Sequence, residues 1–351
     1  MPMRSPSKVC AAVAALAGPC LLAQALPHAP SEHFAGVEFD VESRQQHGLG
    51  SDQWPMTVGP DGHLYAAWGD GWGWTREPDD PKRSMGVTRI VADPDGLRGE
   101  DLWGVGPGSG FAKPEALIAT ESKIYLFWTS GDSRNDEDRT RLAISDDLGK
   151  SWDLGEERSF PGVPPGFRVR SIVQGVTSAR SEWFFIYFGH NRASDLYLAR
   201  VRRTDIAKLE SYQWFAGVGP AGGPKWTAAI DDRQPAFSDP RGYIWHVGVT
   251  YNSALDTYLL TKPHFADDDD REVLNAADSR VASFGVFDAP TPWGPWSTIH
   301  YQDNFLDDKV KFSYFIPTPF ISGDGLSFWL AFSGWPEYDN VNWIRGRLLP
   351  K

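Results

Sequence analysis

The chain of 351 residues has a formal net charge of −12 and contains 16 Trp, 11 Tyr and 20 Phe beside 35 Gly and 27 Pro. This composition is typical of short aromatic strands joined by many turns, which favours an all-β fold over one of long helices. The negative charge repels phosphate backbones and argues against nucleic acid as a partner. The sequence contains no phosphate-binding glycine loop, metal-spaced histidine cluster or nucleophile elbow, so we expect no cofactor.

The first residues have the pattern of an export signal. Arg4 and Lys8 precede an apolar run from Val9 to Leu22, and small residues at 23–25 offer a cleavage site. We expect cleavage near Ala25 and a secreted or periplasmic protein. An uncleaved membrane anchor is the alternative, but the run is short and contains Gly-Pro, which argues against stable insertion.

Both cysteines, Cys10 and Cys20, lie in this predicted signal segment. The mature chain would therefore form no disulfide and no thiolate metal site. An acyl anchor on Cys20 is a further alternative, although the preceding residues are one place out of register for the usual acylation motif. Cleavage also removes Arg4 and Lys8 and no acidic residue, which takes the net charge from −12 to −14.

A strand-like run, a tight turn and an aromatic strand recur five times along the chain. The turns fall at residues 62, 122, 181, 242 and 325, with spacings of about 60, 59, 61 and 83 residues. The paired runs are 56–58 with 62–69, 116–118 with 122–128, 171–173 with 181–187, 236–237 with 242–247, and 319–321 with 325–332. Third strands follow at 88–91, 141–144, 196–200 and 343–348. Because this spacing matches a four-stranded blade with its loops, we predict one monomeric five-bladed β-propeller over residues 48–351.

Two further segments complete the predicted architecture. Residues 34–42, within an N-terminal segment 26–47, alternate apolar and polar side chains and could supply an outer strand to the last blade, which would close the ring and remove free sheet edges. The long gap before the fifth unit contains four consecutive carboxylates, Asp267 to Asp270, which indicate an exposed loop. A structural calcium site is the alternative for this run.

One motif is specific for fold rather than chemistry. Ser145 to Trp152 matches the S-x-D-x-G-x-x-W pattern known as the Asp box of sialidases and other propellers. Its Asp147 can bond the backbone amides of the turn, its Gly149 permits a left-handed conformation, and its Trp packs beneath. We therefore expect a structural role for Asp147. The arginine cluster and tyrosine nucleophile of sialidases are not located in the sequence.

Other segments carry a family resemblance. They are Gly50–Pro55, Trp68–Gly71, Thr250–Leu260 and Ile321–Gly334, and they resemble a family formerly known as domain of unknown function number 4185, which includes bacterial endo-D-arabinanases. Phe287–Trp296 is also similar to the Gly-Pro-Trp blade motif of five-bladed arabinanases and xylosidases. The resemblance implies a central funnel, where inner strands of all five blades converge, with acidic side chains at one mouth.

Hydrolysis of a glycosidic bond needs one carboxylic acid to protonate the leaving oxygen and a second carboxylate to activate water or attack the sugar. We expect inner strands to begin near Asp52, Glu115, Arg170, Asp232 and Tyr314. The catalytic candidates are Asp52 as general base or nucleophile, Asp70 between two glycines, Glu115 kept charged by Lys113, and Asp232 as acid or pKa modulator. Each has a structural alternative, as a turn-capping aspartate or a Lys–Glu pair, and Glu337 and Asp339 are held in reserve.

The expected partner is a carbohydrate, because indole faces suit the apolar C–H surfaces of sugars. The substrate-binding candidates are Trp54, Trp72, Arg170, His190, Arg233, Tyr251 and Trp335. The leading hypothesis is a glycoside hydrolase that acts on a polysaccharide or oligosaccharide, with furanosides such as arabinan first. One alternative is a polysaccharide lyase, in which His190 or Tyr251 removes a proton beside a uronate and Arg170 or Arg233 neutralises its carboxylate. The other is a non-catalytic carbohydrate-binding propeller.

Overall fold

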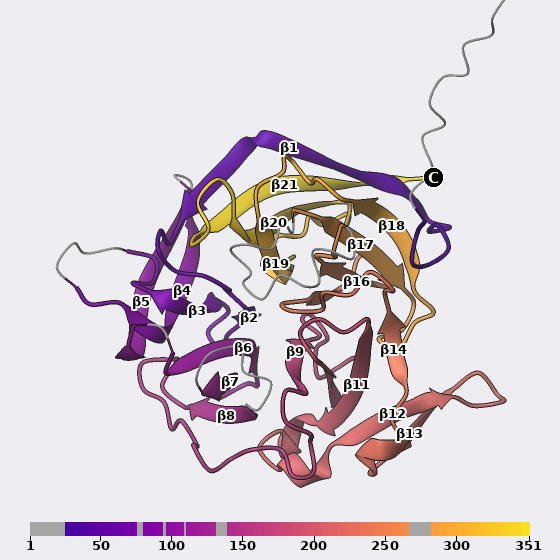
Figure 1. Ribbon diagram of the computed structural model, residues 1–351, viewed down its shortest axis with the longest axis horizontal. Helices are drawn as coiled ribbons and strands as arrows, with labels where there is room; N and C mark the ends of the chain where they lie inside the picture. The colour runs from indigo at the N-terminus through magenta and orange to yellow at the C-terminus, as the bar shows by residue number, and fades with distance from the viewer. Residues whose placement is uncertain (1–24, 76–79, 94–95, 109, 131–138, 267–281) are drawn as a thin grey trace, which may run out of the picture.

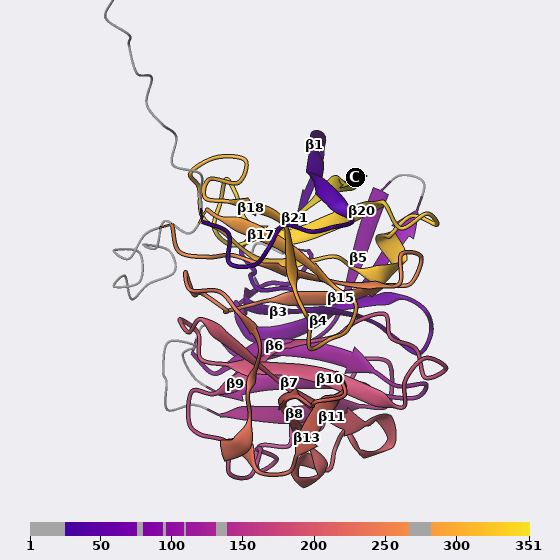
Figure 2. The ribbon, with the colours of Figure 1, turned by 90° about the vertical axis from the view of Figure 1, so that its right-hand side faces the viewer.

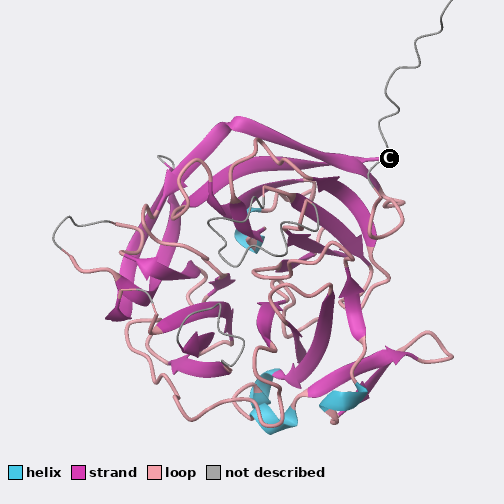
Figure 3. Cartoon of the chain, in the orientation of Figure 1, coloured by secondary structure: helices cyan, strands magenta, loops and turns pink. Residues whose placement is uncertain are grey.

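The computed structural model describes residues 25–75, 80–93, 96–108, 110–130, 139–266 and 282–351. Within these residues the strands form five antiparallel sheets arranged around one axis, which confirms the predicted five-bladed β-propeller (Figure 1). Short 3-10 turns are the helical elements of the described chain (Figure 3). They are η1 (Arg203–Asp205), η2 (Leu209–Ser211), η3 (Ile230–Asp232) and η4 (Thr318–Phe320). The predicted signal segment up to residue 24 and the acidic run at 267–270 lie outside the described residues.

Blades one and two are simple antiparallel meanders. Blade one contains β2 (Met56–Val58), β3 (Leu64–Gly71), β4 (Arg83–Asp93) and β5 (Gly96–Pro107), and blade two contains β6 (Ala112–Ala119), β7 (Ile124–Ser130) and β8 (Thr140–Ser145). The second strands, β3 and β7, are almost entirely buried along their length. Both faces of such a strand pack against neighbouring blades, which explains why their sequences are continuous apolar runs rather than alternating patterns.

Blade three is the largest sheet. Its strands are β9 (Arg168–Ile172), β10 (Trp183–Gly189), β11 (Asp195–Arg202), β12 (Gln213–Val218), β13 (Pro224–Thr227) and β14 (Pro235–Ser238). The first five follow one another in order, and β14 pairs with β11. The blade therefore continues at its outer side into the β12–β13 hairpin, which projects from the ring in Figure 1.

Blades four and five bring the chain back to its beginning. Blade four contains β15 (Gly248–Asn252), β16 (Thr257–Lys262), β17 (Phe284–Ala289) and β18 (Ser297–Gln302), and blade five contains β19 (Lys311–Phe315), β20 (Ser327–Gly334), β21 (Val341–Pro350) and β1 (Phe34–His47). The N-terminal strand β1 pairs with β21, from Phe34 opposite Pro350 to His47 opposite Val341. The C-terminus consequently lies beside β1 (Figures 1 and 2).

Two of the predicted units differ from the structure. The run 242–247 is not a strand, because Tyr243 and His246 adopt left-handed φ values of 61° and 55°. The inner hairpin of blade four is instead β15–β16, and the preceding β14 belongs to blade three. In blade five, prolines on both sides of Thr318 turn the predicted strand 319–321 into η4, so the inner strand is β19.

The segment Ser145–Trp152 forms a tight turn after β8. Asp147 accepts hydrogen bonds from Ser145 Oγ at 2.9 Å, from the Ser151 amide at 2.9 Å and from Ser151 Oγ at 2.7 Å. Gly149 has a φ of 82°, and the Trp152 indole donates to its carbonyl oxygen at 3.0 Å. These bonds occupy the Asp147 carboxylate within its own turn.

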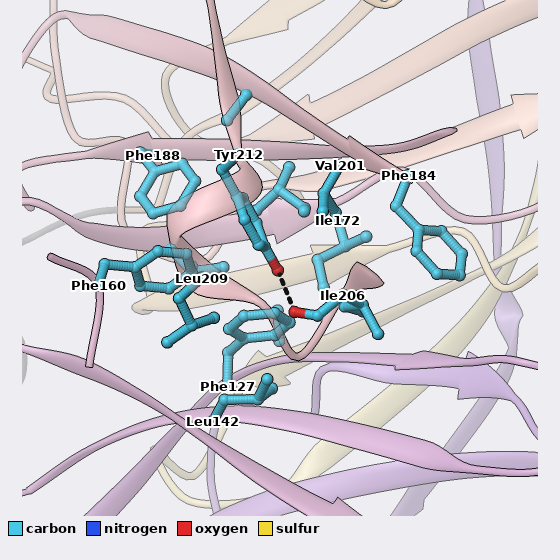
Figure 4. Packing of buried hydrophobic residues seen from close by; sticks show 14 of the residues in the cluster. Phe127, Leu142, Phe160, Ile172, Phe184, Phe188, Val201, Ile206, Leu209 and Tyr212 are labelled. Atoms are coloured by element: carbon cyan, nitrogen blue, oxygen red, sulfur yellow. Dashed lines mark hydrogen bonds between the residues drawn. The ribbon is translucent and has the colours of Figure 1, made fainter. Parts of the chain in front are cut away.

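The core lies between blades. Figure 4 shows the cluster shared by blades two and three, in which Phe127 and Leu142 meet side chains of blade three. Tyr212 lies in the same cluster, and its hydroxyl donates to the Ile206 carbonyl oxygen at 2.8 Å. Because each of the five larger clusters among the described residues joins two neighbouring blades, an inner strand is fixed from both sides, and residues at the strand ends are held in place around the axis.

Candidate functional site

The candidate site lies at one mouth of the propeller, where blade one supplies two aspartates. Asp52 precedes β2 and forms a β-bridge with Gly69, with reciprocal backbone hydrogen bonds of 3.0 Å. Asp70 follows directly in β3, with a left-handed φ of 48°. A side chain at Gly69 would place its Cβ 2.7 Å from Oδ1 of Asp52, so the glycine permits the close approach of the two segments.

A lysine from blade two binds both carboxylates. Nζ of Lys113, in β6, forms an ion pair with Asp70 and lies 3.9 Å from Oδ1 of Asp52. The side chains of Lys113 and Asp52 are 7% and 8% exposed, whereas that of Asp70 is 23% exposed. Two carboxyl groups therefore share one largely buried ammonium, and Asp70 is the more accessible of the two.

Burial and neighbouring charges shift the pKa values of Asp52 and Lys113. Burial raises the pKa of Asp52 to about 6, against the opposing effect of Lys113, and the charges of Asp70 and Asp339 add to the rise. Burial lowers the pKa of Lys113, but the charges of Asp52 and Asp70 outweigh it, so the net shift is upward. Asp52 is thus a carboxyl group that can hold its proton close to neutral pH beside a lysine that stays charged.

Residues of the loop after β20 complete this mouth. Burial raises the pKa of Asp339, and Lys82 lies 3.7 Å from its Oδ2. Nζ of Lys82 lies 4.8 Å from the centre of the Trp72 ring, which places the predicted sugar-binding Trp72 near the mouth. Burial raises the pKa of Tyr338 well above its usual value, and nearby Tyr243 and the carboxylates of the site add to this effect.

Glu115 lies deeper and belongs to a separate ionic group. Its Oε1 is 3.7 Å from Nη1 of Arg168 and accepts a hydrogen bond from Thr129 Oγ1 at 3.3 Å, and its Oε2 accepts one from Nη1 of Arg170 at 3.3 Å. Arg170 also donates to the Gly189 carbonyl oxygen at 2.9 Å. The expected pairing of Glu115 with Lys113 is therefore wrong, because β6 shifts register between Pro114 and Ala116 and the lysine reaches blade one.

Blade four contributes a histidine that the sequence analysis did not select. His246 is 1% exposed, and burial lowers its pKa well below the usual value, with Arg170, Lys113 and Arg168 acting in the same direction. Its imidazole is therefore neutral beside the two ionic groups. The neighbouring Trp245 stacks against Phe312 of β19, with ring centres 5.9 Å apart. Between the inner strands of the five blades there is a small cavity of about 20 Å³, and Glu115 is one of the residues that line it.

The structure does not bring Asp232 into this site. Asp232 is exposed in η3, beside β12 of blade three, and the expectation that it begins an inner strand of blade four is wrong. Arg233 packs its guanidinium over the rings of Phe167 and Tyr197, at 4.7 and 4.9 Å from their centres. His190 is exposed and lies against Phe167 as well.

Three further aromatic candidates are either buried or engaged with other residues. Trp54 is 1% exposed in the core, so it does not present a ring face to a ligand. The Tyr251 hydroxyl donates to Asp256 at 2.7 Å at the far end of β15. Trp335 donates from its indole to Asp307 at 2.6 Å and lies under Arg44. Glu337 of the same loop is exposed and bonded to Gln46.

Among the described residues, no three His, Cys, Asp or Glu side chains are grouped so that they could hold a metal ion. No helix in that part of the chain has the length and apolar character needed to cross a membrane.

Fold and site together define a five-bladed β-propeller with an acidic pair at one mouth. No family model and no curated protein matches the sequence. A proposed hydrolase from Bacteroides ovatus is similar in structure, with a TM-score of 0.55 and 11% identity over 88% of this chain and 90% of that one. An endo-arabinase from Bacteroides thetaiotaomicron has a TM-score of 0.45 and 11% identity, and the match covers 86% of this chain and 94% of that one. The arabinanase Arb43A from Bacillus subtilis has a TM-score of 0.48 and 12% identity, and the match covers 88% of this chain and 99% of that one. The first similarity supports the fold alone, and the two weaker ones carry no weight for fold or activity.

Proposed function

We propose that this protein is a glycoside hydrolase in which Asp52 and Asp70 are the paired carboxyl groups. The observation that carries the proposal is the shared ammonium of Lys113, which both carboxylates approach from one mouth of the propeller. Two carboxyls on one ammonium lie within the roughly 10 Å that inverting and retaining hydrolases use. Asp70, whose side chain is 23% exposed, is the member of the pair that solvent reaches, so a substrate would approach from its side.

The two environments suggest different roles. Asp52, whose pKa is raised to about 6 by burial, supplies the proton for the leaving oxygen. Asp70, more exposed and ion-paired with Lys113, acts as the base or nucleophile on the opposite side of the scissile bond. This reverses the role that the sequence alone suggested for Asp52.

The proposed substrate is a polysaccharide or oligosaccharide, with furanosides such as arabinan tested first because of the family resemblance. Trp72, beside Lys82 and Asp339, is positioned to contact a sugar at the mouth. Secretion after cleavage near Ala25 would place the protein where such polymers occur. The absence of a required cofactor and a monomeric state belong to the same proposal.

The lyase alternative is less well supported by the side-chain positions. Arg170 is engaged with Glu115, Arg233 packs on aromatic rings of blade three, and Tyr251 bonds to Asp256 at the other end of its strand. These groups do not converge on one substrate carboxylate. A non-catalytic carbohydrate-binding propeller remains the outcome to expect if no substrate is turned over.

The test is a polysaccharide screen with detection of new reducing ends. Wild type should release sugar from at least one substrate, and Asp52→Asn and Asp70→Asn should each lower turnover by about 10² to 10⁴ fold. Asp232→Asn is the matched control, since Asp232 is an exposed aspartate outside the site. Unchanged turnover in both site variants would reject the pair, and products that absorb in the ultraviolet would select the lyase.

Activated aryl glycosides separate the two roles. A good leaving group needs little protonation, so Asp52→Asn should retain most of its activity on such a substrate, whereas Asp70→Asn should lose activity on both kinds. The opposite result would exchange the roles and leave the pair intact.

A further inference from the structure

A groove that shares no lining residue with the acidic pair lies on the outside of the ring. It has a volume of about 580 Å³ and is formed by β1, β20, β21 and the segment around η4. Figure 1 shows β1 and β21 at the outer edge of blade five. The volume is within the range of about 300 to 1,000 Å³ that is typical of small-ligand sites.

The strand register explains why polar side chains gather over this groove. Asp40 of β1 is paired with Arg345 of β21, and Arg345 is paired with Trp329 of β20. Directly paired residues of antiparallel strands point to the same face, and so do residues two positions away along each strand. Glu38, Arg347 and Ser327 form the second row by the same pairing. One face of blade five therefore presents a row of acids, a row of guanidinium groups and an indole.

The charged groups over this groove are equal in number and opposite in sign, but they do not form ion pairs with one another. Glu38, Asp40, Arg345 and Arg347 are exposed, and among the described residues none of the four takes part in an ion pair within 4 Å. Arg347 instead donates to Ser327 Oγ at 3.0 Å, and the Arg345 guanidinium lies 5.1 Å from the centre of the Trp329 ring. Donors, acceptors and aromatic surface are thus adjacent, and the charged residues that line the groove are two acids and two arginines.

From this arrangement we infer that the groove is a second carbohydrate-binding site, which holds an uncharged segment of a polysaccharide against Trp329. A sugar ring offers an apolar C–H face for the half-buried indole and hydroxyl groups for both guanidinium and carboxylate partners. Two acids and two arginines match a neutral ligand better than an anionic or cationic one. The inference rests on the proposed function, because a polymer long enough to leave the axial mouth is its natural ligand.

Binding measurements in an inactive background test the inference. Asp70→Asn protein, with and without Trp329→Ala, is run in affinity gels that contain arabinan, xylan or a mixed-linkage glucan. We expect Trp329→Ala to lower the affinity for at least one of these polymers about tenfold, which would be seen as weaker retardation in the gel. A tenfold loss of affinity corresponds to about 1.4 kcal/mol of lost aromatic contact. Arg345→Ser, an exposed change at the rim, should weaken it in the same direction without disturbing the core.

The matched control is Trp183→Ala on β10 of blade three. Trp183 is also half-buried and lies beneath arginines, with Arg200 and Arg202 at 4.1 and 4.7 Å from its ring. Its replacement should leave polymer binding unchanged. Equal loss in the Trp183 and Trp329 variants, or unchanged binding in both Trp329→Ala and Arg345→Ser, would overturn the inference.

Short substrates distinguish this inference from the proposed function. In the active enzyme, Trp329→Ala should leave kcat/KM for a disaccharide or aryl glycoside unchanged and lower it for the polymer. If the wild type hydrolyses nothing but is retarded by a polymer through Trp329, the hydrolase proposal fails and the groove stands. If the wild type hydrolyses a polymer, and the replacements of Trp329 and Arg345 change neither its binding nor its hydrolysis, the hydrolase proposal stands and the inference about the groove fails.

Discussion

The ammonium nitrogen of Lys113 on blade two lies 3.9 Å from Oδ1 of Asp52 on blade one. The same nitrogen forms an ion pair with Asp70, so one positive charge serves two carboxyl groups. Two ionised carboxylates beside one ammonium leave a net negative charge, and because Asp52 and Lys113 are nearly buried, water cannot fully solvate it. One of the carboxyls is therefore driven toward its protonated form, and the measurable consequences concern both stability and catalysis.

Asp52 should make the protein less stable as the pH rises. Its pKa is raised from 3.8 in the unfolded reference to about 6 in the folded protein. The folded state consequently binds more protons between these values, so the free energy of unfolding falls as the pH rises through this window and stays lower above it. The difference is about 3 kcal/mol. Urea unfolding at pH 4 and pH 8 measures it, and Asp52→Asn should remove this part of the pH dependence.

The control for this measurement is Asp232→Asn, which changes an exposed aspartate with the same loss of charge. It should unfold with the pH dependence of the wild type. If Asp52→Asn also keeps the full pH dependence, then Asp52 does not hold its proton in the folded state, and its proposed acid role loses its basis.

Replacement of Lys113 by methionine should move the pH profile of activity. The ammonium lowers the pKa of Asp52, so its loss raises that pKa further. If Asp52 is the proton donor, the alkaline limb of kcat/KM moves upward by about one unit or more. Turnover at the optimum should also fall, because Asp70 loses its partner. Lys123→Met, at an exposed ion pair with Asp146, should change neither property. A fall in activity with an unmoved alkaline limb would assign the limb to another group.

Glu115 should prove structural rather than catalytic. It is 2% exposed and faces two arginines that are equally buried, so Glu115→Gln removes a buried negative charge from beside two positive ones. Removal of one partner from a buried ionic group costs about 3 to 5 kcal/mol. We expect that loss in urea unfolding, with the activity per folded molecule retained within a few fold. Glu157→Gln is the exposed control. A large loss of kcat in a stably folded Glu115→Gln protein would restore its catalytic assignment.

Much of the fold follows from local sequence patterns. Continuous apolar runs such as those of β3 and β7 are expected for strands packed on both faces, and their regular spacing indicates the blades. The pattern was misleading where the backbone departs from strand geometry. Residues 242–247 have aromatic strand composition, yet left-handed Tyr243 and His246 make them a turn, and this error also displaced the expected start of blade four to Asp232.

The candidate site was predictable to a similar extent. Asp52 and Asp70 stand out because each adjoins a break between aromatic strands, and glycines surround Asp70. Arg168 could have been found, since it lies two positions before Arg170 and strand alternation puts both on one face. The reach of Lys113 to blade one could not, because it depends on a register shift in β6 and on how two blades pack. Asp339 joins the site through a loop with no periodic pattern.

The segment that carries Trp245 and His246 to the axis depends on a second buried ion pair. Nζ of Lys262, in β16, donates to Oδ2 of Asp239 at 2.5 Å and to the Gly242 carbonyl oxygen at 2.8 Å, and neither charged side chain is exposed. Lys262→Met should therefore destabilise the protein by about 3 to 5 kcal/mol, because the Asp239 carboxylate is left without its cation.

The stability of a variant that lacks the acidic partner, Asp239→Leu, should depend on pH. Burial lowers the pKa of Lys262, so in Asp239→Leu the lysine can lose its proton instead of remaining charged. The unfolded chain then binds the proton more tightly than the folded one, and the stability of Asp239→Leu should rise with pH between neutrality and the usual lysine range. The double variant Lys262→Met, Asp239→Leu should be more stable than either single variant, since it removes both buried charges together. A double-mutant cycle by urea unfolding measures this coupling, and simple addition of the two single losses would show that the pair does not hold this segment in place.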